Sequence, residues 1–175
     1  MDLSDNGLVS TARTFATQAH TGQVRKYTGE PYIVHPAAVV ALVATRLHTA
    51  EMLATAWLHD VVEDTSVTID DIGDRFGAVV ADMVWALTDL PGGGSRAARK
   101  ARDRARLASA SPAAQTIKLA DLIDNSQTIM AHDPKFAVVY MAEKAALLDV
   151  LVRGDGALLD RARGIVEAWQ LSRIP

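Results

Sequence analysis

The sequence predicts an all-α protein that forms one domain of about eight to nine helices. Apolar residues recur at spacings of three and four along nearly the whole chain, and no convincing stretch alternates with a period of two. The chain has 175 residues, which suits a single domain over residues 1–175. We find no internal repeat and no linker long enough to divide two domains.

The helices are expected in an order set by this periodicity and by its interruptions. Gly22 and Gly29 bracket a loop after the first helix, and Pro36 begins the second. The third segment, over residues 51–64, is apolar apart from a few polar groups near its end. The expected helices span residues 4–21, 36–48, 51–64, 68–76, 77–90, 96–110, 113–132, 134–153 and 155–171.

Capping signals support the later boundaries. Thr68 and Asp71 resemble a capping box in which aspartate replaces the usual glutamate. Residues 91–94, Pro-Gly-Gly-Gly, mark a clear break. Ser111 and Asp133 each precede a proline, so we expect them to be N-caps of helices whose first turns contain Pro112 and Pro134.

Composition narrows the classes of function. Hydrophobic residues make up 49% of the chain and charged residues 22%, so a normal core can form. Cysteine is absent, so a metal site must use histidine and carboxylates. No signal peptide is visible at the N-terminus, and the apolar run 37–44 is too short to span a membrane. A net charge of −3 disfavours general nucleic-acid binding. We therefore expect a cytoplasmic enzyme.

The most informative segment is residues 59–64, His-Asp-Val-Val-Glu-Asp. In a continuous helix, His59 and Glu63 would lie one turn apart, and so would Asp60 and Asp64. Four polar groups on an apolar helix need a partner, because burial of an unpaired charge is costly. A divalent cation is one such partner.

Other segments carry groups that could join this cluster. His35 precedes Pro36, and Arg25 and Lys26 lie in the loop before it. Asp121 and Asn125 share one face of a later helix, with Asp124 between them. Two imidazoles and two carboxylates form a mixed ligand set that suits a divalent ion such as Mn²⁺.

The remaining histidines are interpreted conservatively. A lone histidine in an apolar protein is usually a structural or surface residue, and we assign that role to His48 and His132. His20 borders the loop that carries Arg25, so a functional role competes with the structural interpretation that we favour.

Taken together, the motifs resemble those of the His-Asp (HD) superfamily of metal-dependent phosphohydrolases. The closer resemblance is to the hydrolase domains of RelA/SpoT-type enzymes and to small alarmone hydrolases, including metazoan SpoT homologues. It spans roughly residues 8–150. The matching stretches are AHTGQVRK (residues 19–26), GEPYIVHP (29–36), LHDVVEDT (58–65), FG (76–77), LTD (87–89) and IKLAD (117–121).

This resemblance implies a helical HD-type fold and a role for each matched residue. Glu63 and Asp64 are expected to act on the hydrolytic water, and Arg25 and Lys26 to contact the nucleotide. Asn125 and Tyr140 are expected to contact ribose or phosphate. The implied ligands of Mn²⁺, or of another divalent cation, are His35, His59, Asp60 and Asp121.

The chain departs from the family pattern after Asp121. Arginines are often found at the positions occupied here by Leu122 and Gln127. Part of the nucleotide pocket is therefore altered, although the expected metal ligand is present.

Three functions remain open at this point. The first is hydrolysis of the 3′-diphosphate of (p)ppGpp, giving GDP or GTP and pyrophosphate. The second keeps the metal but acts on another nucleotide, such as a nucleoside monophosphate or a phosphorylated dinucleotide. The third, a non-enzymatic binding module, is disfavoured because the ligands and the Glu63-Asp64 pair are all present. No nucleic-acid or membrane partner is expected, and homo-oligomerisation is left open.

Charge is unevenly distributed. Residues 96–106 carry six basic residues and one acidic residue, a net charge of +5 in a chain of net −3. The segment could steer a polyanionic substrate. We slightly favour the simpler interpretation, a solvated helix face. Lys118 likewise could serve the substrate or pair with a carboxylate.

Overall fold

The computed structural model describes residues 5–89 and 93–173 and confirms the all-α fold. The expected helix positions at residues 4 and 90, and Pro91 and Gly92 of the expected break, lie outside the described residues. Within them the chain forms ten helices and no strand. None of these helices combines the length and apolar character that crossing a bilayer requires.

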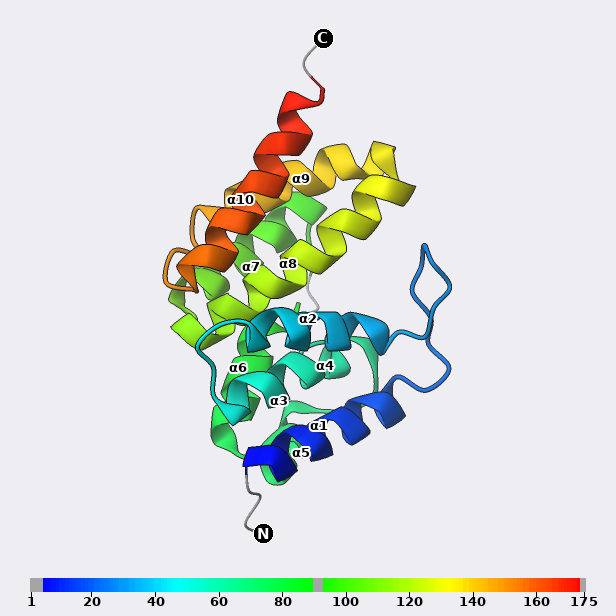
Figure 1. Ribbon diagram of the computed structural model, residues 1–175, viewed down its shortest axis with the longest axis vertical. Coiled ribbons are helices and arrows are strands. Elements are labelled where there is room, and N and C mark those ends of the chain that lie inside the picture. The colour runs from blue at the N-terminus through cyan, green and yellow to red at the C-terminus, as the bar shows by residue number, and fades with distance from the viewer. Residues whose placement is uncertain (1–4, 90–92, 174–175) are drawn as a thin grey trace. The chain divides into compact units, whose positions relative to one another are not determined.

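The chain divides into two compact units, Met1–Pro91 and Gly92–Pro175. The expectation of a single domain stays a prediction. The first unit contains α1 (Asp5–Ala19), α2 (Val34–Ala44), α3 (Ala50–Leu58), α4 (Val61–Asp64), α5 (Ile69–Phe76) and α6 (Ala78–Leu87). The second unit contains α7 (Arg96–Ser109), α8 (Pro112–His132), α9 (Pro134–Leu148) and α10 (Gly156–Leu171) (Figure 1).

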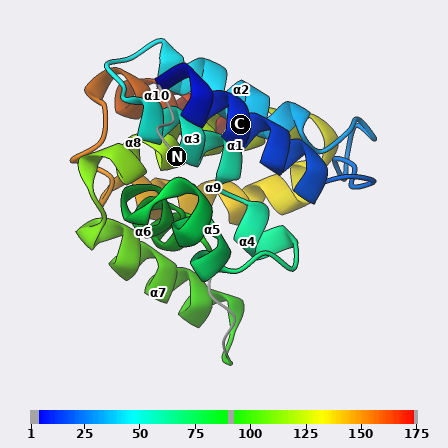
Figure 2. The same cartoon turned by 90° about the horizontal axis from the view of Figure 1, so that it is seen from below.

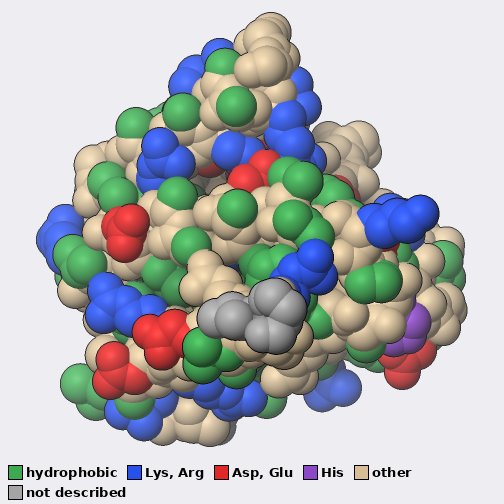
Figure 3. All heavy atoms as spheres, turned by 90° about the horizontal axis from the view of Figure 1, so that it is seen from above, with side chains coloured by type: hydrophobic (Ala, Val, Ile, Leu, Met, Phe, Trp, Pro, Cys, Tyr) green, Lys and Arg blue, Asp and Glu red, His purple; other side chains and the backbone are tan. Residues whose placement is uncertain are grey.

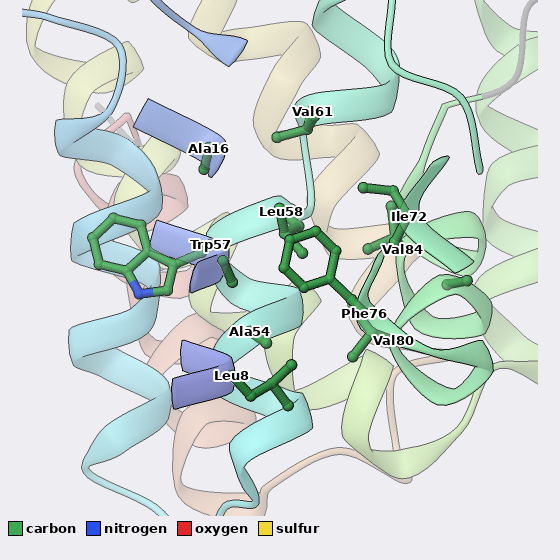
Figure 4. Packing of buried hydrophobic residues seen from close by; sticks show 12 residues of the cluster. Leu8, Ala16, Ala54, Trp57, Leu58, Val61, Ile72, Phe76, Val80 and Val84 are labelled. Carbon is green, nitrogen blue, oxygen red and sulfur yellow. The ribbon is translucent and has the colours of Figure 1, made fainter. Parts of the chain in front are cut away.

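Helix α3 is the central element of the first unit. It packs against α1, α2 and α6, while α5 packs against α6 (Figures 1 and 2). Ala16 of α1 and Ala54 of α3 are fully buried, and their small side chains allow close helix packing. Figure 4 shows larger side chains filling the core between these helices, among them Leu58, Ile72 and Phe76. A close-packed core of this kind fixes the C-terminal end of α3, where His59 follows.

The expected continuous helix over residues 51–64 is wrong. Helix α3 ends at Leu58, and the four-residue α4 begins at Val61. Asp60 has φ −100° and ψ −6°, which takes the chain out of regular helical geometry. One helical hydrogen bond survives, from the Asp64 amide to the Asp60 carbonyl at 2.9 Å. The split accounts for the count of ten helices where eight to nine were expected.

Other boundaries differ by a few residues. Helix α2 begins at Val34, so His35 and Pro36 lie in its first turn, and it ends at Ala44 where residue 48 was expected. Helix α9 ends at Leu148 where residue 153 was expected. The capping box of Thr68 and Asp71 is confirmed, as are the N-caps Ser111 and Asp133.

A tight hairpin-like loop joins α1 to α2. An antiparallel bridge pairs Val24 with Pro31, and the Tyr32 amide donates to the Gln23 carbonyl at 3.0 Å. Gly29 closes the turn with φ 72°, a conformation that favours glycine. The loop therefore places Gln23 directly beside Tyr32, three residues before His35.

In the second unit, α8, α9 and α10 pack against one another. The turn before α10 is anchored on α8. The Arg153 amide donates to Gln115 Oε1 at 2.9 Å, and the Asp155 amide donates to Thr116 Oγ1 at 2.9 Å. A Cβ on Gly154 would lie 2.8 Å from Leu119 Cδ1 and 3.1 Å from α8 backbone atoms, so only glycine fits without movement. These contacts hold the helix that carries Asp121.

Candidate metal centre

Two buried histidines in the first unit face each other. His35 Nε2 and His59 Nε2 are 3.2 Å apart, and the residues are only 1% and 2% exposed. His59 Nδ1 lies 2.9 Å from the Ala56 carbonyl oxygen, which can only accept a hydrogen bond. His59 Nδ1 therefore carries a hydrogen, and Nε2 is the nitrogen that faces His35. A neutral imidazole oriented by a backbone carbonyl is a common metal ligand.

Asp60 adds an anionic oxygen to this pair. Its Oδ2 lies 3.2 Å from His59 Nε2 and 3.4 Å from His35 Nε2. Burial alone would raise the pKa of the Asp60 carboxyl, but the two imidazoles beside it lower this pKa well below its usual range. Two nitrogens and one ionised oxygen thus converge, and this donor set fits a divalent cation.

Tyr32 contacts this cluster, a role that the sequence did not predict. Its hydroxyl donates to Asp60 Oδ2 at 2.6 Å. Burial, followed by the charge of Asp60, raises the pKa of Tyr32, so its phenol remains a hydrogen-bond donor. The only sequence signal was its place in the segment Pro-Tyr-Ile-Val-His, and that spacing does not reveal where a phenol points.

Glu63 and Asp64 follow directly in α4. Glu63 Oε2 accepts a hydrogen bond from the Asp89 amide at 2.9 Å, which holds this exposed side chain in place. Although much of Asp64 is exposed, partial removal of its carboxyl from water raises its pKa, and the nearby Asp60 carboxylate raises it further. Glu63 therefore offers a carboxylate fixed by a hydrogen bond, and Asp64 offers a carboxylate that binds a proton more readily than usual.

Arg25 and Lys26 lie in the hairpin-like loop, as the sequence predicted. The Arg25 amide donates to the Glu30 carbonyl at 2.8 Å, and the Gly29 amide donates to the Arg25 carbonyl at 2.9 Å. Lys26 is exposed, with its Nζ 3.2 Å from the Tyr27 hydroxyl. The backbone of this basic pair is thus held in the same loop that carries Tyr32.

In the second unit, Asp121 is buried and its carboxylate is bound within its own helix. Lys118 Nζ donates to Asp121 Oδ2 at 2.7 Å, and Asn125 Nδ2 donates to Oδ1 at 2.6 Å. Of the two interpretations of Lys118, pairing with a carboxylate is therefore observed. His35, His59 and Asp121 are all buried, and each offers one atom that could bind a metal ion.

The other residues expected at the nucleotide pocket differ in exposure. Tyr140 is 7% exposed, and its ring packs at 6.0 Å from Phe136, centroid to centroid. Leu122 is buried in the second unit, whereas Gln127 is exposed. The chain therefore has a core side chain at one of the two departures from the family pattern and a neutral surface group at the other.

The remaining histidines separate into two kinds. His48 and His132 are exposed and bond to carbonyls of nearby residues, at 2.7 and 3.0 Å, which agrees with the surface role assigned to them. His20 is 3% exposed and packs on Tyr32, with 4.7 Å between ring centroids. It is therefore a buried neighbour of the candidate centre.

Much of the basic segment is engaged in intramolecular contacts. Arg96 forms a two-pronged ion pair with Glu143 at 2.6 and 2.9 Å, and Arg99 and Arg102 donate to the carbonyls of Gly94 and Gly93. On the face drawn in Figure 3, Lys and Arg side chains form several separate groups among hydrophobic and neutral ones. The contacts of Arg96, Arg99 and Arg102 agree with the solvated helix face that we favoured.

Comparison with known proteins places the chain in a family. A family model described as HD domain matches residues 12–153. The chain is 36% identical over 124 residues to the guanosine-3′,5′-bis(diphosphate) 3′-pyrophosphohydrolase of Aquifex aeolicus, covering 69% of this chain and 18% of that protein. It is 45% identical over 75 residues to the bifunctional (p)ppGpp synthase/hydrolase SpoT of Escherichia coli, covering 43% and 10% respectively. The chain thus spans less than a fifth of the length of either relative.

A solved structure agrees over nearly the whole chain. The structure of a metazoan orthologue of SpoT that hydrolyses ppGpp has a TM-score of 0.83 and 26% identity, covering 92% of this chain and 94% of that one. A Listeria monocytogenes protein, with a TM-score of 0.70 and 24% identity, shares the fold. The resemblance that the motifs indicated is confirmed, and the chain belongs to the HD-domain family.

Proposed function

We propose that this chain is a metal-dependent (p)ppGpp 3′-pyrophosphohydrolase. The observation that carries the proposal is the convergence of His35 Nε2, His59 Nε2 and Asp60 Oδ2 in the first unit. The names of the SpoT-type relatives supply the substrate class. We propose that residues 1–175 form one domain that carries this activity in the cytoplasm. The oligomeric state stays open.

In this proposal His35, His59, Asp60 and Asp121 hold a divalent cation, with Mn²⁺ as our preferred ion. Buried imidazoles and carboxylates without thiolates suit such an ion. Asp121 is the ligand that the second unit would contribute, and it would exchange its bonds to Lys118 and Asn125 for the metal. When bound, a divalent ion lowers the pKa of a coordinated water and withdraws charge from a phosphate oxygen.

Glu63 and Asp64 would manage the protons of the reaction. The bond from the Asp89 amide keeps Glu63 in a fixed position, from which it can orient the attacking water. The raised pKa of Asp64 suits a group that accepts a proton from water and later returns one to the leaving oxygen. Water would attack the phosphorus next to the ribose 3′ oxygen, and the products would be GDP or GTP and pyrophosphate.

Basic and polar groups would bind the nucleotide. Arg25 and Lys26, held in the loop between α1 and α2, would contact it directly. Asn125 and Tyr140 of the second unit would contact ribose or phosphate. Because the Tyr140 ring packs beside Phe136, its contact with substrate would use the hydroxyl end of the side chain.

A second candidate, another nucleotide as substrate, is favoured by Leu122 and Gln127. With a buried leucine and a neutral glutamine at these positions, the chain offers fewer cations to a polyphosphate than its relatives do. A nucleoside monophosphate or a phosphorylated dinucleotide needs fewer such contacts. A non-enzymatic binding module is the least favoured alternative.

The test is a nucleotide panel. The purified protein is incubated with Mn²⁺ and ppGpp, pppGpp or nucleoside monophosphates, and the products are separated and quantified. The proposal predicts one pyrophosphate for each ppGpp consumed. Release of single orthophosphates, or faster turnover of nucleoside monophosphates than of ppGpp, would favour the second candidate. Metal binding without turnover of any nucleotide would favour the binding module.

A further inference from the structure

Three residues outside the expected ligand set form a connected chain beside the metal centre. Tyr32 donates its hydroxyl hydrogen to Asp60 Oδ2 at 2.6 Å. This is the same carboxylate oxygen that faces His35 Nε2 and His59 Nε2. An ionised carboxylate accepts hydrogen bonds only, so the phenol must be the donor. The hydroxyl therefore limits rotation of the Asp60 carboxylate.

Tyr32 is itself held on two sides. Its ring lies against the buried His20 ring, with 4.7 Å between centroids and 32° between planes, and it meets the His35 ring edge-on at 6.0 Å. Its amide donates to the Gln23 carbonyl at 3.0 Å, which ties it to the opposite side of the loop. These contacts fix both the ring and the backbone of Tyr32, independently of its hydroxyl bond to Asp60.

Gln23 and His20 extend this chain to α4. Gln23 Nε2 donates to the Asp64 carbonyl at 2.9 Å. The same amide must then turn its Oε1 toward His20 Nδ1, which lies 2.7 Å away. Because an amide oxygen only accepts, His20 Nδ1 carries the hydrogen. One loop therefore bonds to both ends of the Asp60–Asp64 segment.

His20 Nε2 is buried and has no hydrogen-bond partner within the described residues. Burial of an unsatisfied polar atom costs stability, so a side chain chosen only for packing would be apolar. The imidazole supplies what an apolar ring of similar shape lacks, a hydrogen at Nδ1 for Gln23. This contrast argues that orientation of the loop matters more at this position than stability alone.

We propose that Tyr32 is a positioning residue that orients the Asp60 carboxylate for metal binding, and that His20 and Gln23 hold Tyr32 and α4 in place for this role. The inference rests on the metal site of the proposed function. Residues that hydrogen-bond to metal ligands typically change metal affinity by about 10–100-fold when they are removed. Tyr32 is expected to fall in this range.

The test compares Tyr32→Phe with the wild type by calorimetric titration of the metal-free protein with Mn²⁺. Loss of the hydroxyl should raise the dissociation constant for Mn²⁺ by about 10–100-fold. Tyr27→Phe removes a hydroxyl from the same loop, one that accepts from the exposed Lys26, and should leave metal affinity unchanged. Gln23→Met should weaken binding in the same direction by a smaller factor.

A second measurement on the same variant separates positioning from a general loss of structure. If the hydroxyl acts on the Asp60 carboxylate, Tyr32→Phe should weaken Mn²⁺ binding while circular dichroism and thermal unfolding of the metal-free protein stay close to those of the wild type. A loss of Mn²⁺ affinity accompanied by a matching loss of helicity would overturn the inference. Unchanged Mn²⁺ affinity in Tyr32→Phe would also overturn the inference. If the wild type binds Mn²⁺ and hydrolyses ppGpp in the same experiment, the proposed function would stay intact. A wild type that binds no divalent ion would overturn both.

Should Tyr32→Phe fail to fold, Gln23→Met provides the test, because this substitution leaves the backbone hydrogen bonds of the loop in place. Weaker Mn²⁺ binding with unchanged thermal unfolding of the metal-free protein would support positioning. Full Mn²⁺ affinity in that variant would overturn it.

Discussion

The first unit holds His35, His59 and Asp60 with their ligand atoms facing one another, whereas the second unit holds Asp121 by bonds within its own helix. In the first unit, His59 Nδ1 is held by the Ala56 carbonyl, and Asp60 Oδ2 accepts a hydrogen bond from the Tyr32 hydroxyl. In the second, both oxygens of Asp121 accept bonds, from Lys118 and Asn125. In the first unit the nitrogen and oxygen atoms converge on one another, whereas in the second unit the Asp121 oxygens accept hydrogen bonds from residues of the same helix.

The difference bears on how each region would respond to a cation. The three groups of the first unit crowd two nitrogens and a carboxylate together, and a cation would satisfy all of them at once. Asp121 has a positive neighbour already, because the Lys118 ammonium lies 2.7 Å from it. We infer that the first unit supplies the preformed part of the metal site and that Asp121 joins by exchange of partners.

The largest expected effect comes from removal of a ligand on either side of this comparison. His59→Ala and Asp121→Ala should each lose the bound ion and abolish hydrolysis, because no other group replaces the missing ligand. Metal content by elemental analysis and helicity by circular dichroism check the two halves of this expectation. His48→Ala, which changes an exposed histidine, is the control. Full metal content in both ligand variants would rule out the proposed set.

The next effect separates chemistry from metal binding within the first unit. Glu63→Gln and Asp64→Asn should keep the ion but lose about 100-fold or more in turnover, a usual contribution of a general acid or base. Metal content and kcat are measured on the same samples, with the exposed Asp82→Asn as control. Near-normal turnover in both variants would remove the pair from the mechanism.

The pH dependence of turnover sharpens the role of Asp64. The pKa of its carboxyl is raised by partial burial and by Asp60, so the group keeps its proton to a higher pH than an exposed aspartate does. As a base it must be ionised, and turnover should therefore rise as pH increases through this raised pKa. Asp64→Asn should remove that limb of the profile, and an unchanged limb would assign it to another group.

A smaller effect compares basic residues of the two units. Arg25→Ala and Lys26→Ala should each raise KM for ppGpp by about tenfold and spare kcat, since a charge contact made equally in ground and transition states affects binding alone. Arg102→Ala, in the basic segment of α7, should leave KM unchanged. The Arg102 guanidinium donates to the Gly93 carbonyl, and we interpret this helix face as solvated. A rise in KM for Arg102→Ala would instead support the steering role.

The smallest effect concerns stability of the first unit alone. Thr68→Ala breaks the capping box at the start of α5 and should lower the free energy of unfolding by about 1 kcal/mol near pH 7. The Thr68 hydroxyl lowers the pKa of Asp71, so the part of the stabilisation that comes from the ionised Asp71 carboxylate is present above the ordinary aspartate pKa and is lost as pH falls. Chemical denaturation should therefore show a difference from wild type that shrinks below about pH 4. A gap that widened in acid would contradict this linkage, and Ser66→Ala is the exposed control.

Local pattern was sufficient to predict the helices, because each depends on a periodic apolar face and on caps a few residues away. It failed at residues 51–64, where the helix is interrupted at Asp60, a break that neither spacing nor propensity indicates. That break is also where the site lies. At this point Asp60 also makes a tertiary contact, with His35 Nε2 at 3.4 Å.

The expected ligands in the first unit could be named from the motifs, but the residues that contact them could not. Tyr32 is separated from Asp60 by 28 residues, and the bond between them depends on how the loop that pairs Val24 with Pro31 places Tyr32. For His20, the sequence left a functional role in competition with the structural one, and it gave no sign of the contact with Gln23. Such contacts depend on side-chain direction in the folded chain, which residue spacing alone does not set.

The most direct test of the account titrates Mn²⁺ into metal-free protein while bound metal and pyrophosphate release from ppGpp are measured on the same samples. Turnover should rise in proportion to bound metal until a single ion per chain is reached, with pyrophosphate as the phosphate product. Equal turnover before and after metal removal, or full metal binding without pyrophosphate release, would contradict the claim that this HD-domain chain is a metal-dependent (p)ppGpp pyrophosphohydrolase.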